Sequence, residues 1–230
     1  MFEKWLDLLS DCMLFKGIPF GQLGGMLSCI EPKVKSYTRN EFISIEGERF
    51  NGIGLVLSGN AAVTRENAAG ERVIMSVLEP GELFGEMAAF LDSKTWPATV
   101  VAQNKCSIMF LPPGKIVGQC EKVCDSHRML ALNMLRILSR KAAALNRKVE
   151  YLAMGSLRSK IAAFLLEQAK NAGTTTFLLQ MKRNELADYL NASRPSLSRE
   201  MGRMRDEGVL EFHRSSIRIR DMGRLREMTE

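Results

Sequence analysis

The chain has 230 residues, a formal net charge of +6 and a hydrophobic content of 46%. This length and composition suffice for one large or two ordinary globular domains. No apolar run reaches the ~18 residues that a transmembrane helix needs, and Glu3, Lys4, Asp7 and Asp11 interrupt the N-terminus where a signal peptide would be apolar. The chain has five cysteines, an odd number, and it is large enough to fold without stabilising disulfides. We therefore expect a cytoplasmic protein with reduced thiols and no membrane association.

Residues 1–116 are expected to form a β-domain preceded by short helices. Seven short segments rich in apolar and β-branched residues are separated by turn signals such as Ser58-Gly59-Asn60; the segments are 34–38, 42–46, 53–59, 61–66, 72–78, 99–103 and 106–111. Strands at this spacing predict a jelly-roll barrel or a sandwich. The domain is net acidic, which argues against nucleic acid as its partner.

Residues 117–154 are expected to form a long central helix. Apolar residues repeat there in alternating steps of four and three, which gives an a/d seam that begins at Ala131. Such a seam normally faces a second helix, although it could instead pack on the chain's own barrel. Gly155-Ser156 then interrupts the helical pattern, as a hinge would. The expected homodimer interface comprises Leu135, Leu138, Ala142, Leu145, Val149 and Leu152.

Residues 155–230 have the pattern of a helix-turn-helix domain. Ala187, Asn191 and Leu197 are spaced as the small residue of a first helix, a residue in a sharp turn and a core residue of a second helix. Ser193 is a good N-cap for that second helix. The residues expected to be buried between the helices are Leu186, Leu190, Leu197, Met201 and Met204.

The polar face of the second helix carries the side chains that a DNA groove requires. Arginine forks match the major-groove edge of guanine, and serine can contact a base or a phosphate. The expected DNA-binding residues are Lys182, Arg183, Ser193, Arg194, Ser196, Arg199 and Arg203. The alternative is an ordinary helical hairpin with a solvated basic face. Two short alternating segments, 209–212 and 217–220, predict a β-hairpin after the helix and so favour a winged helix-turn-helix.

In this order, the segments resemble the CRP/FNR family, named for the cyclic-AMP receptor protein and the fumarate and nitrate reduction regulator. The resemblance rests on LSGNAAVTR and PGELFGEMAAF in the barrel and on LNASRPSLSREMGRMRDEGVLE in the helix-turn-helix, and it covers nearly the whole chain. It implies an α+β fold with an N-terminal cyclic-nucleotide-binding-like β-roll, a long central dimerisation helix and a C-terminal winged helix-turn-helix. It also implies a bacterial, homodimeric, effector-responsive transcriptional regulator that binds a palindromic operator in double-stranded DNA and contacts RNA polymerase.

The effector pocket implied by the resemblance comprises Phe84, Gly85, Glu86, Met87, Trp96 and Pro97. In cyclic-AMP binders of the family, an Arg-Ser pair at the position of Trp96-Pro97 supplies the cation that neutralises the cyclic phosphate. A buried phosphate without that cation would cost roughly several kcal/mol. Cyclic AMP is therefore not the expected effector. Trp96 suits either an apolar or planar small molecule, or a pocket that the indole itself fills.

Iron–sulfur and haem sensing both occur in the family. Its iron–sulfur members carry three closely spaced N-terminal cysteines, whereas Cys12 and Cys29 stand far apart here, so no such cluster is expected. Cys120 and Cys124 could form a thiol switch or could be small packing residues. His127 is the histidine outside the predicted hairpin that could ligate haem. The helix-turn-helix resembles the branch that controls nitrosative-stress genes such as that of the hybrid-cluster protein, so haem-dependent sensing of nitric oxide or another gas stays open.

No catalytic arrangement is evident, so an enzyme is not expected. Glu82 and Glu86 lie on one short loop rather than across a cleft, and the sequence has no metal-ligand cluster and no phosphate-binding loop. The rival to a DNA-binding regulator is a regulatory module that uses the barrel without sequence-specific DNA binding. Pro195 stands where many family members carry a glutamate that contacts cytosine, so we expect weak binding to the operators of the two founding members.

Overall fold

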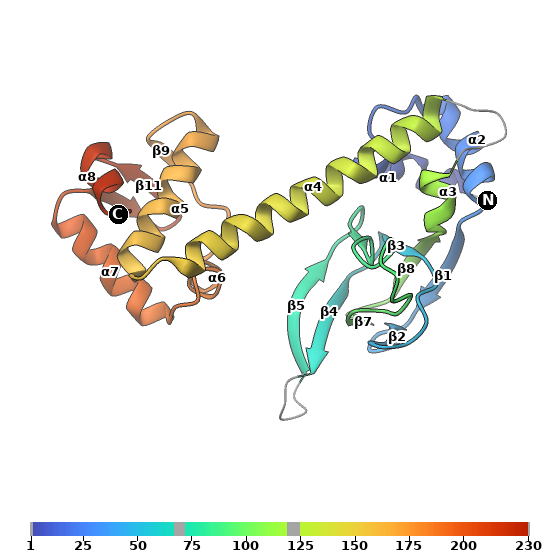
Figure 1. The fold of residues 1–230 in the computed structure, drawn as a ribbon, viewed down its shortest axis with the longest axis horizontal. Helices are drawn as coiled ribbons and strands as arrows, with labels where there is room; N and C mark the ends of the chain where they lie inside the picture. The colour runs from blue at the N-terminus through green and yellow to red at the C-terminus, as the bar shows by residue number, and fades with distance from the viewer. Residues whose placement is uncertain (1, 67–71, 119–124, 230) are drawn as a thin grey trace. The chain divides into compact units, whose positions relative to one another are not determined.

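Figure 1 shows the computed structural model, which describes residues 2–66, 72–118 and 125–229. The chain divides into two compact units, Met1–Arg140 and Lys141–Glu230. The predicted α+β class is confirmed, with an N-terminal β-domain, a long helix and a C-terminal helix-turn-helix that carries a small wing. Within the described ranges, no helix has an apolar stretch that is long enough to cross a membrane.

The N-terminal unit contains short helices, two sheets and the first part of the long helix. Its helical segments are η1 (Glu3–Trp5), α1 (Leu6–Asp11), η2 (Met13–Phe15), α2 (Phe20–Ile30), α3 (Pro113–Val117) and α4 (Asp125–Ala153), the last of which continues into the second unit. Its strands are β1 (Lys33–Tyr37), β2 (Phe42–Ser44), β3 (Ile53–Ser58), β4 (Ala61–Glu66), β5 (Arg72–Leu78), β6 (Leu83–Phe84), β7 (Thr99–Ala102) and β8 (Cys106–Leu111).

These strands form two antiparallel sheets, ordered β1-β8-β3-β6 and β2-β7-β4-β5. Each of the seven segments predicted from the sequence overlaps one of these strands, and β1 begins one residue before its predicted segment, at Lys33. The two-residue strand β6 was not predicted, because only its pairing with β3, Gly54 opposite Phe84 and Leu55 opposite Leu83, makes it a strand. A Cβ on Gly54 would lie 2.0 Å from the Phe84 ring. Glycine is therefore what allows the ring to cross β3 at this point.

The helices of the N-terminal unit cover the sheet that contains β3 and β8. Leu14 and Leu27 from the N-terminal helices share one buried cluster with Leu55, Met109 and, from α4, Leu130. The α4 side chains Leu130, Met134 and Ile137 are buried there. The start of the long helix is thus part of the β-domain's core.

A buried amide fixes the start of α4 to the N-terminal segment. Asn133 is 2% exposed, and its Nδ2 donates to the carbonyl oxygens of Leu14 at 3.0 Å and Lys16 at 2.7 Å. Its Oδ1 accepts from Arg136 at 3.0 Å. The side chain thereby satisfies main-chain groups that apolar packing alone would leave without partners.

The C-terminal unit contains the end of α4 followed by the helix-turn-helix and its wing. Its other elements are α5 (Leu157–Ala172), β9 (Thr176–Leu178), α6 (Arg183–Tyr189), α7 (Arg194–Asp206), β10 (Leu210–His213), β11 (Ser216–Ile219) and α8 (Met222–Glu227). The sheet order is β10-β11-β9. The predicted hairpin is β10-β11, but its turn is shorter than predicted because His213 pairs with Ser216. The third strand, β9, was not predicted.

The helical pattern breaks at Gly155-Ser156, as predicted, between α4 and α5. Ser156 caps α5 by accepting a hydrogen bond from the Ser159 N–H at 3.0 Å. Before the break, Tyr151 is 5% exposed, packs on the ring of Phe164 and donates its hydroxyl hydrogen to Glu167. The last turn of α4 is therefore anchored on α5, and the division between the two compact units falls inside α4 instead of at the break.

We predict that Asn133→Ala lowers the free energy of unfolding by about 1–3 kcal/mol, because the buried carbonyl oxygen of Leu14 and the partly buried carbonyl oxygen of Lys16 lose their donor. Urea unfolding followed by circular dichroism measures the change. Ser139→Ala, at an exposed position on the same helix, is the control and should change stability by less than about 0.5 kcal/mol. Equal midpoints for the two variants would contradict the role given to Asn133.

Candidate DNA-binding surface

Local packing holds α6 and α7 at the spacing that the sequence predicts. Ala187 is 1% exposed, and its carbonyl accepts a hydrogen bond from the Ala192 N–H at 2.9 Å. Asn191 has φ of 52°, the left-handed conformation expected of a residue in a sharp turn. The five side chains expected between the helices are each 0% exposed: Leu186, Leu190, Leu197, Met201 and Met204. The predicted helix-turn-helix is confirmed.

The N-terminus of α7 brings three of the expected DNA-binding side chains together. Ser193 is the N-cap, as predicted, and accepts from the Ser196 N–H at 3.3 Å. Its hydroxyl also donates to Ser196 Oγ at 2.9 Å, and Nη2 of Arg199 donates to the same Ser196 oxygen at 3.4 Å. Arg194 is exposed beside them. Together with the positive end of the helix dipole, they form a polar, positively charged surface whose donors suit the phosphates and base edges of DNA.

Arg203 differs from Arg199 because its own helix supplies a counter-charge. Its Nη1 lies 3.2 Å from Oε2 of Glu200, although 69% of its side chain is exposed. A DNA phosphate would have to compete with that carboxylate. Arg199 therefore presents its charge to a groove more directly than Arg203 does.

Lys182 and Arg183 are adjacent in the sequence but have different environments. Lys182 is exposed, and its N–H donates to the Glu185 carboxylate at 2.8 Å. The Arg183 guanidinium lies over the Phe212 ring of β10, with its carbon 4.9 Å from the ring centroid, and burial lowers the pKa of Arg183. Its position ties α6 to the wing and leaves Lys182 as the more accessible cation.

Sequence reasoning missed Arg158 on α5. Its guanidinium donates to the carboxylates of Glu200 and Glu207 on α7. Hydrogen bonds to Glu207 and Glu200 raise the pKa of Arg158, and those from Arg158 hold the pKa of Glu207 below its ordinary value. The partners lie 42 and 49 residues away, so no local motif could have shown the contact.

Among the residues of the expected effector pocket, Trp96 and Glu86 are buried in the β-domain. Trp96 is 3% exposed and packs between Phe50 and Phe84, with ring centroids 4.6 Å and 5.8 Å away. A Cβ on Gly85 would lie 2.6 Å from Trp96 Cζ3. Glu86 is 1% exposed. The indole thus fills the space beside Gly85, which supports the second of the two alternatives for Trp96.

Two of the expected pocket residues point outward instead. Met87 is 60% exposed, and Pro97 is exposed while its carbonyl oxygen accepts a hydrogen bond from Arg65 at 3.2 Å. The six residues therefore divide into a buried group and a surface group.

Most of the expected dimer seam is exposed along α4. Leu135 is 59% exposed, Leu145 60%, Val149 57% and Leu152 40%. Ala142 is exposed as well, whereas Leu138 packs partly against the core of the β-domain. Packing of the seam against the chain's own barrel, the alternative interpretation, therefore explains the partial burial of Leu138. It does not explain the exposure of Ala142, Leu145, Val149 and Leu152.

The two histidines considered for haem ligation differ in their exposure to solvent. His127 is 7% exposed, whereas His213 lies exposed on the wing. In the part of the chain that the structure describes, no group of three or more His, Cys, Asp or Glu side chains could hold a metal ion. Cys120 and Cys124 lie outside the described residues.

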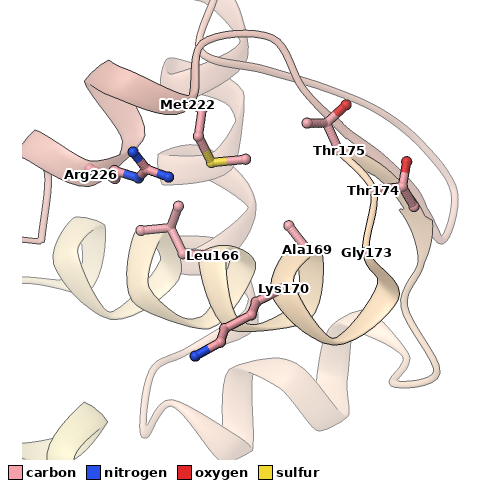
Figure 2. Close-up of a pocket in the computed structure, with 8 residues that line it drawn as sticks. All are labelled: Leu166, Ala169, Lys170, Gly173, Thr174, Thr175, Met222 and Arg226. Carbon is pink, nitrogen blue, oxygen red and sulfur yellow. The ribbon is translucent and has the colours of Figure 1, made fainter.

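A surface pocket of 490 Å³ lies elsewhere on the C-terminal unit (Figure 2). Leu166, Ala169 and Met222 provide its apolar part, and the charged side chains Lys170 and Arg226 stand beside them. Its lining comes from α5, the segment before β9 and α8, with no residue from α6 or α7. The pocket is therefore separate from the surface formed by Ser193, Ser196 and Arg199.

Two family models match this chain. The model of the cyclic nucleotide-binding domain matches residues 34–122, and that of the Crp-like helix-turn-helix domain matches residues 159–228. Together they cover well over half of the sequence. The chain belongs to the CRP/FNR family of transcriptional regulators, which are effector-responsive DNA-binding proteins and not enzymes.

Curated relatives resemble the chain over most of their length. The Cyclic AMP receptor protein of Thermus thermophilus is 25% identical over 94% of this chain and 95% of its own. The Global nitrogen regulator of Nostoc is 23% identical over 82% and 85%, and Transcriptional activator protein anr of Pseudomonas aeruginosa is 25% identical over 80% and 75%. Relatives with such different names are about equally similar, so similarity does not select an effector.

Solved structures support the same fold. The Catabolite Activator Protein of Thermus thermophilus aligns with a TM-score of 0.54 and 24% identity over 94% of this chain and 98% of its own. A CooA mutant from Carboxydothermus hydrogenoformans aligns with a TM-score of 0.56 and 18% identity over 88% and 90%.

Proposed function

We propose that the protein is a homodimeric regulator that reads a palindromic operator with the N-terminal half of α7. The observation that carries this proposal is the exposed network of Ser193, Ser196 and Arg199, which is fixed by the helix cap. Preorganised polar side chains lose little conformational freedom when they bind a base edge. Lys182 and Arg194 supply phosphate or base contacts beside this network, and RNA polymerase in the cytoplasm is the expected downstream partner.

The dimer forms through the exposed seam of α4. Leu145, Val149 and Leu152 would leave a contiguous apolar stripe in water if the chain were a monomer. A parallel pair of these helices buries the stripe and supplies the two-fold axis that two half-sites ~34 Å apart require. The a/d spacing of the stripe matches such a pair.

The effector is a molecule other than cyclic AMP. The buried Trp96 ring stands at the place where the resemblance puts the phosphate-binding arginine, and Phe50 and Phe84 enclose it. An apolar environment of this kind disfavours an unpaired anion. The sequence of the helix-turn-helix supports a place in the nitrosative-stress branch of the family, but His127, the histidine considered for haem ligation, is buried.

Binding titrations of variants should distinguish residues that read bases from residues that contact phosphates. The probe is a duplex that the wild-type protein selects from a random library, compared with a scrambled duplex at several salt concentrations. Arg199→Ala or Arg194→Ala should cost about 1–3 kcal/mol on the selected duplex only. Lys182→Ala should weaken both duplexes and reduce the slope of log affinity against log salt by about one. The reverse pattern would mean that α7 is wrongly oriented in the groove.

Leu145→Asp should convert the dimer to a monomer, because two carboxylates would face each other in an apolar seam. Multi-angle light scattering at micromolar concentration measures the mass. The matched control is Ala143→Asp, which adds the same charge at an exposed position on the opposite side of the helix and should leave the dimer intact. A wild-type monomer would refute the assignment of the seam.

Cyclic AMP should neither bind nor increase affinity for the selected duplex. Isothermal titration calorimetry of the purified protein should give no binding heat, and the duplex titration should be unchanged when cyclic AMP is added. A dissociation constant that is micromolar or tighter would show that some other group neutralises the phosphate beside Trp96.

A further inference from the structure

An ion-pair cluster joins the first turn of α5 to the recognition helix. Nε of Arg158 lies 2.6 Å from Oε1 of Glu200. Nη1 and Nη2 of Arg158 donate to the two carboxylate oxygens of Glu207 at 2.9 Å and 2.7 Å. The side chains are 32%, 14% and 34% exposed in the order Arg158, Glu200 and Glu207. Forked contacts of this kind fix direction as well as distance.

The charge at each end of the cluster is unfavourable for the helix that carries it. Arg158 places a cation in the first turn of α5, and Glu207 places an anion at the C-cap of α7. Both charges oppose the dipole of their own helix. The local stability of α5 or α7 therefore does not explain these residues, whereas their pairing across 49 positions of sequence does.

The cluster also reaches side chains that are expected to meet DNA. Glu200 directly follows Arg199 and holds Arg158 with one carboxylate oxygen and Arg203 with the other. At the end of α7, Arg224 of α8 donates to the carbonyl oxygen of Glu207 at 2.8 Å. Both the middle and the end of the recognition helix are thus tied to their surroundings through the same two acidic residues.

The start of α5 is in turn tied to the end of α4. Ser156 caps α5 immediately before Arg158, and Tyr151 of α4 contacts Glu167 of α5. Arg147 of α4 adds an ion pair with Glu167 at 2.9 Å. Side-chain contacts therefore join α4 to α5 at Glu167 and α5 to α7 at Arg158, and the α5 helix itself connects the two positions.

We propose that Arg158 is a positioning residue that holds α7 in the orientation needed for base reading. This inference rests on the proposed function, in which α7 reads the operator. Arg158 itself contacts no DNA; it acts through Glu200 and Glu207.

The test compares Arg158→Gln with the wild type on the library-selected duplex and on its scrambled form, across salt concentrations. Affinity for the selected duplex should fall about tenfold, while affinity for the scrambled duplex and the salt slope stay unchanged. Arg158→Lys keeps the charge but loses the fork, so it should restore only part of the lost preference. Arg226→Gln is the matched control, because it removes an exposed charge that lines the separate pocket of Figure 2.

Other outcomes would overturn the inference. Equal weakening on both duplexes, with a slope smaller by about one, would make Arg158 a phosphate contact. Unchanged preference with a lower melting temperature would make the cluster purely structural. If Arg158→Gln does not fold, Glu207→Gln removes the forked partner of Arg158 and keeps its ion pair with Glu200, and an unchanged preference of that folded variant for the selected duplex would refute the positioning role. A wild-type protein that selects no sequence would instead refute the proposed function, and this inference with it.

Discussion

The 29-residue helix α4 is the constraint on which both halves of this protein depend. Its first turns are buried against the β-domain, its last turn is anchored by Tyr151, and residues 141–150 between them are all exposed. Arg147 and Lys148 in this stretch contact Glu167 and Tyr189, but the apolar side chains Leu145 and Val149 are exposed, and a helix draws little stability from its own sequence without apolar packing. In the dimer proposed above, pairing of this apolar stripe would stabilise and stiffen the middle of α4.

The basic residues of the C-terminal unit have two different environments, although in the sequence they look like one group of positive charges. Arg199 is exposed and held by a serine, as a base-reading side chain should be. Arg183 and Arg158 are also cations near the helix-turn-helix, but they are partly buried against Phe212 and the acidic residues of α7. Some of the positive charge in this domain thus holds its helices and wing together, and only the remainder is exposed on the surface proposed to bind DNA.

Local periodicity explains what could be predicted from the sequence. The helix-turn-helix, the cap at Ser193, the break at Gly155 and the seven longer strands all depend on residues close to one another in the chain. The short strands β6 and β9 could not be predicted, because two or three residues carry no periodicity and become strands only by pairing with distant partners. The contacts of Arg158 were hidden for the same reason. The pocket residues were identified by resemblance, but whether Trp96 leaves room for a ligand is decided by packing that no motif encodes.

The contact between Trp96 and Gly85 limits how the sensing specificity of this chain could evolve. Replacing Trp96 by arginine would leave a guanidinium against Phe50 and Phe84, and replacing the rings first would open a cavity beside the indole. Either intermediate is destabilised, by a buried unpaired charge in one order and by lost packing in the other. Single mutational steps toward an anion-binding pocket therefore pass through destabilised proteins, so the aromatic filling restricts which ligand chemistries this part of the barrel could acquire one residue at a time.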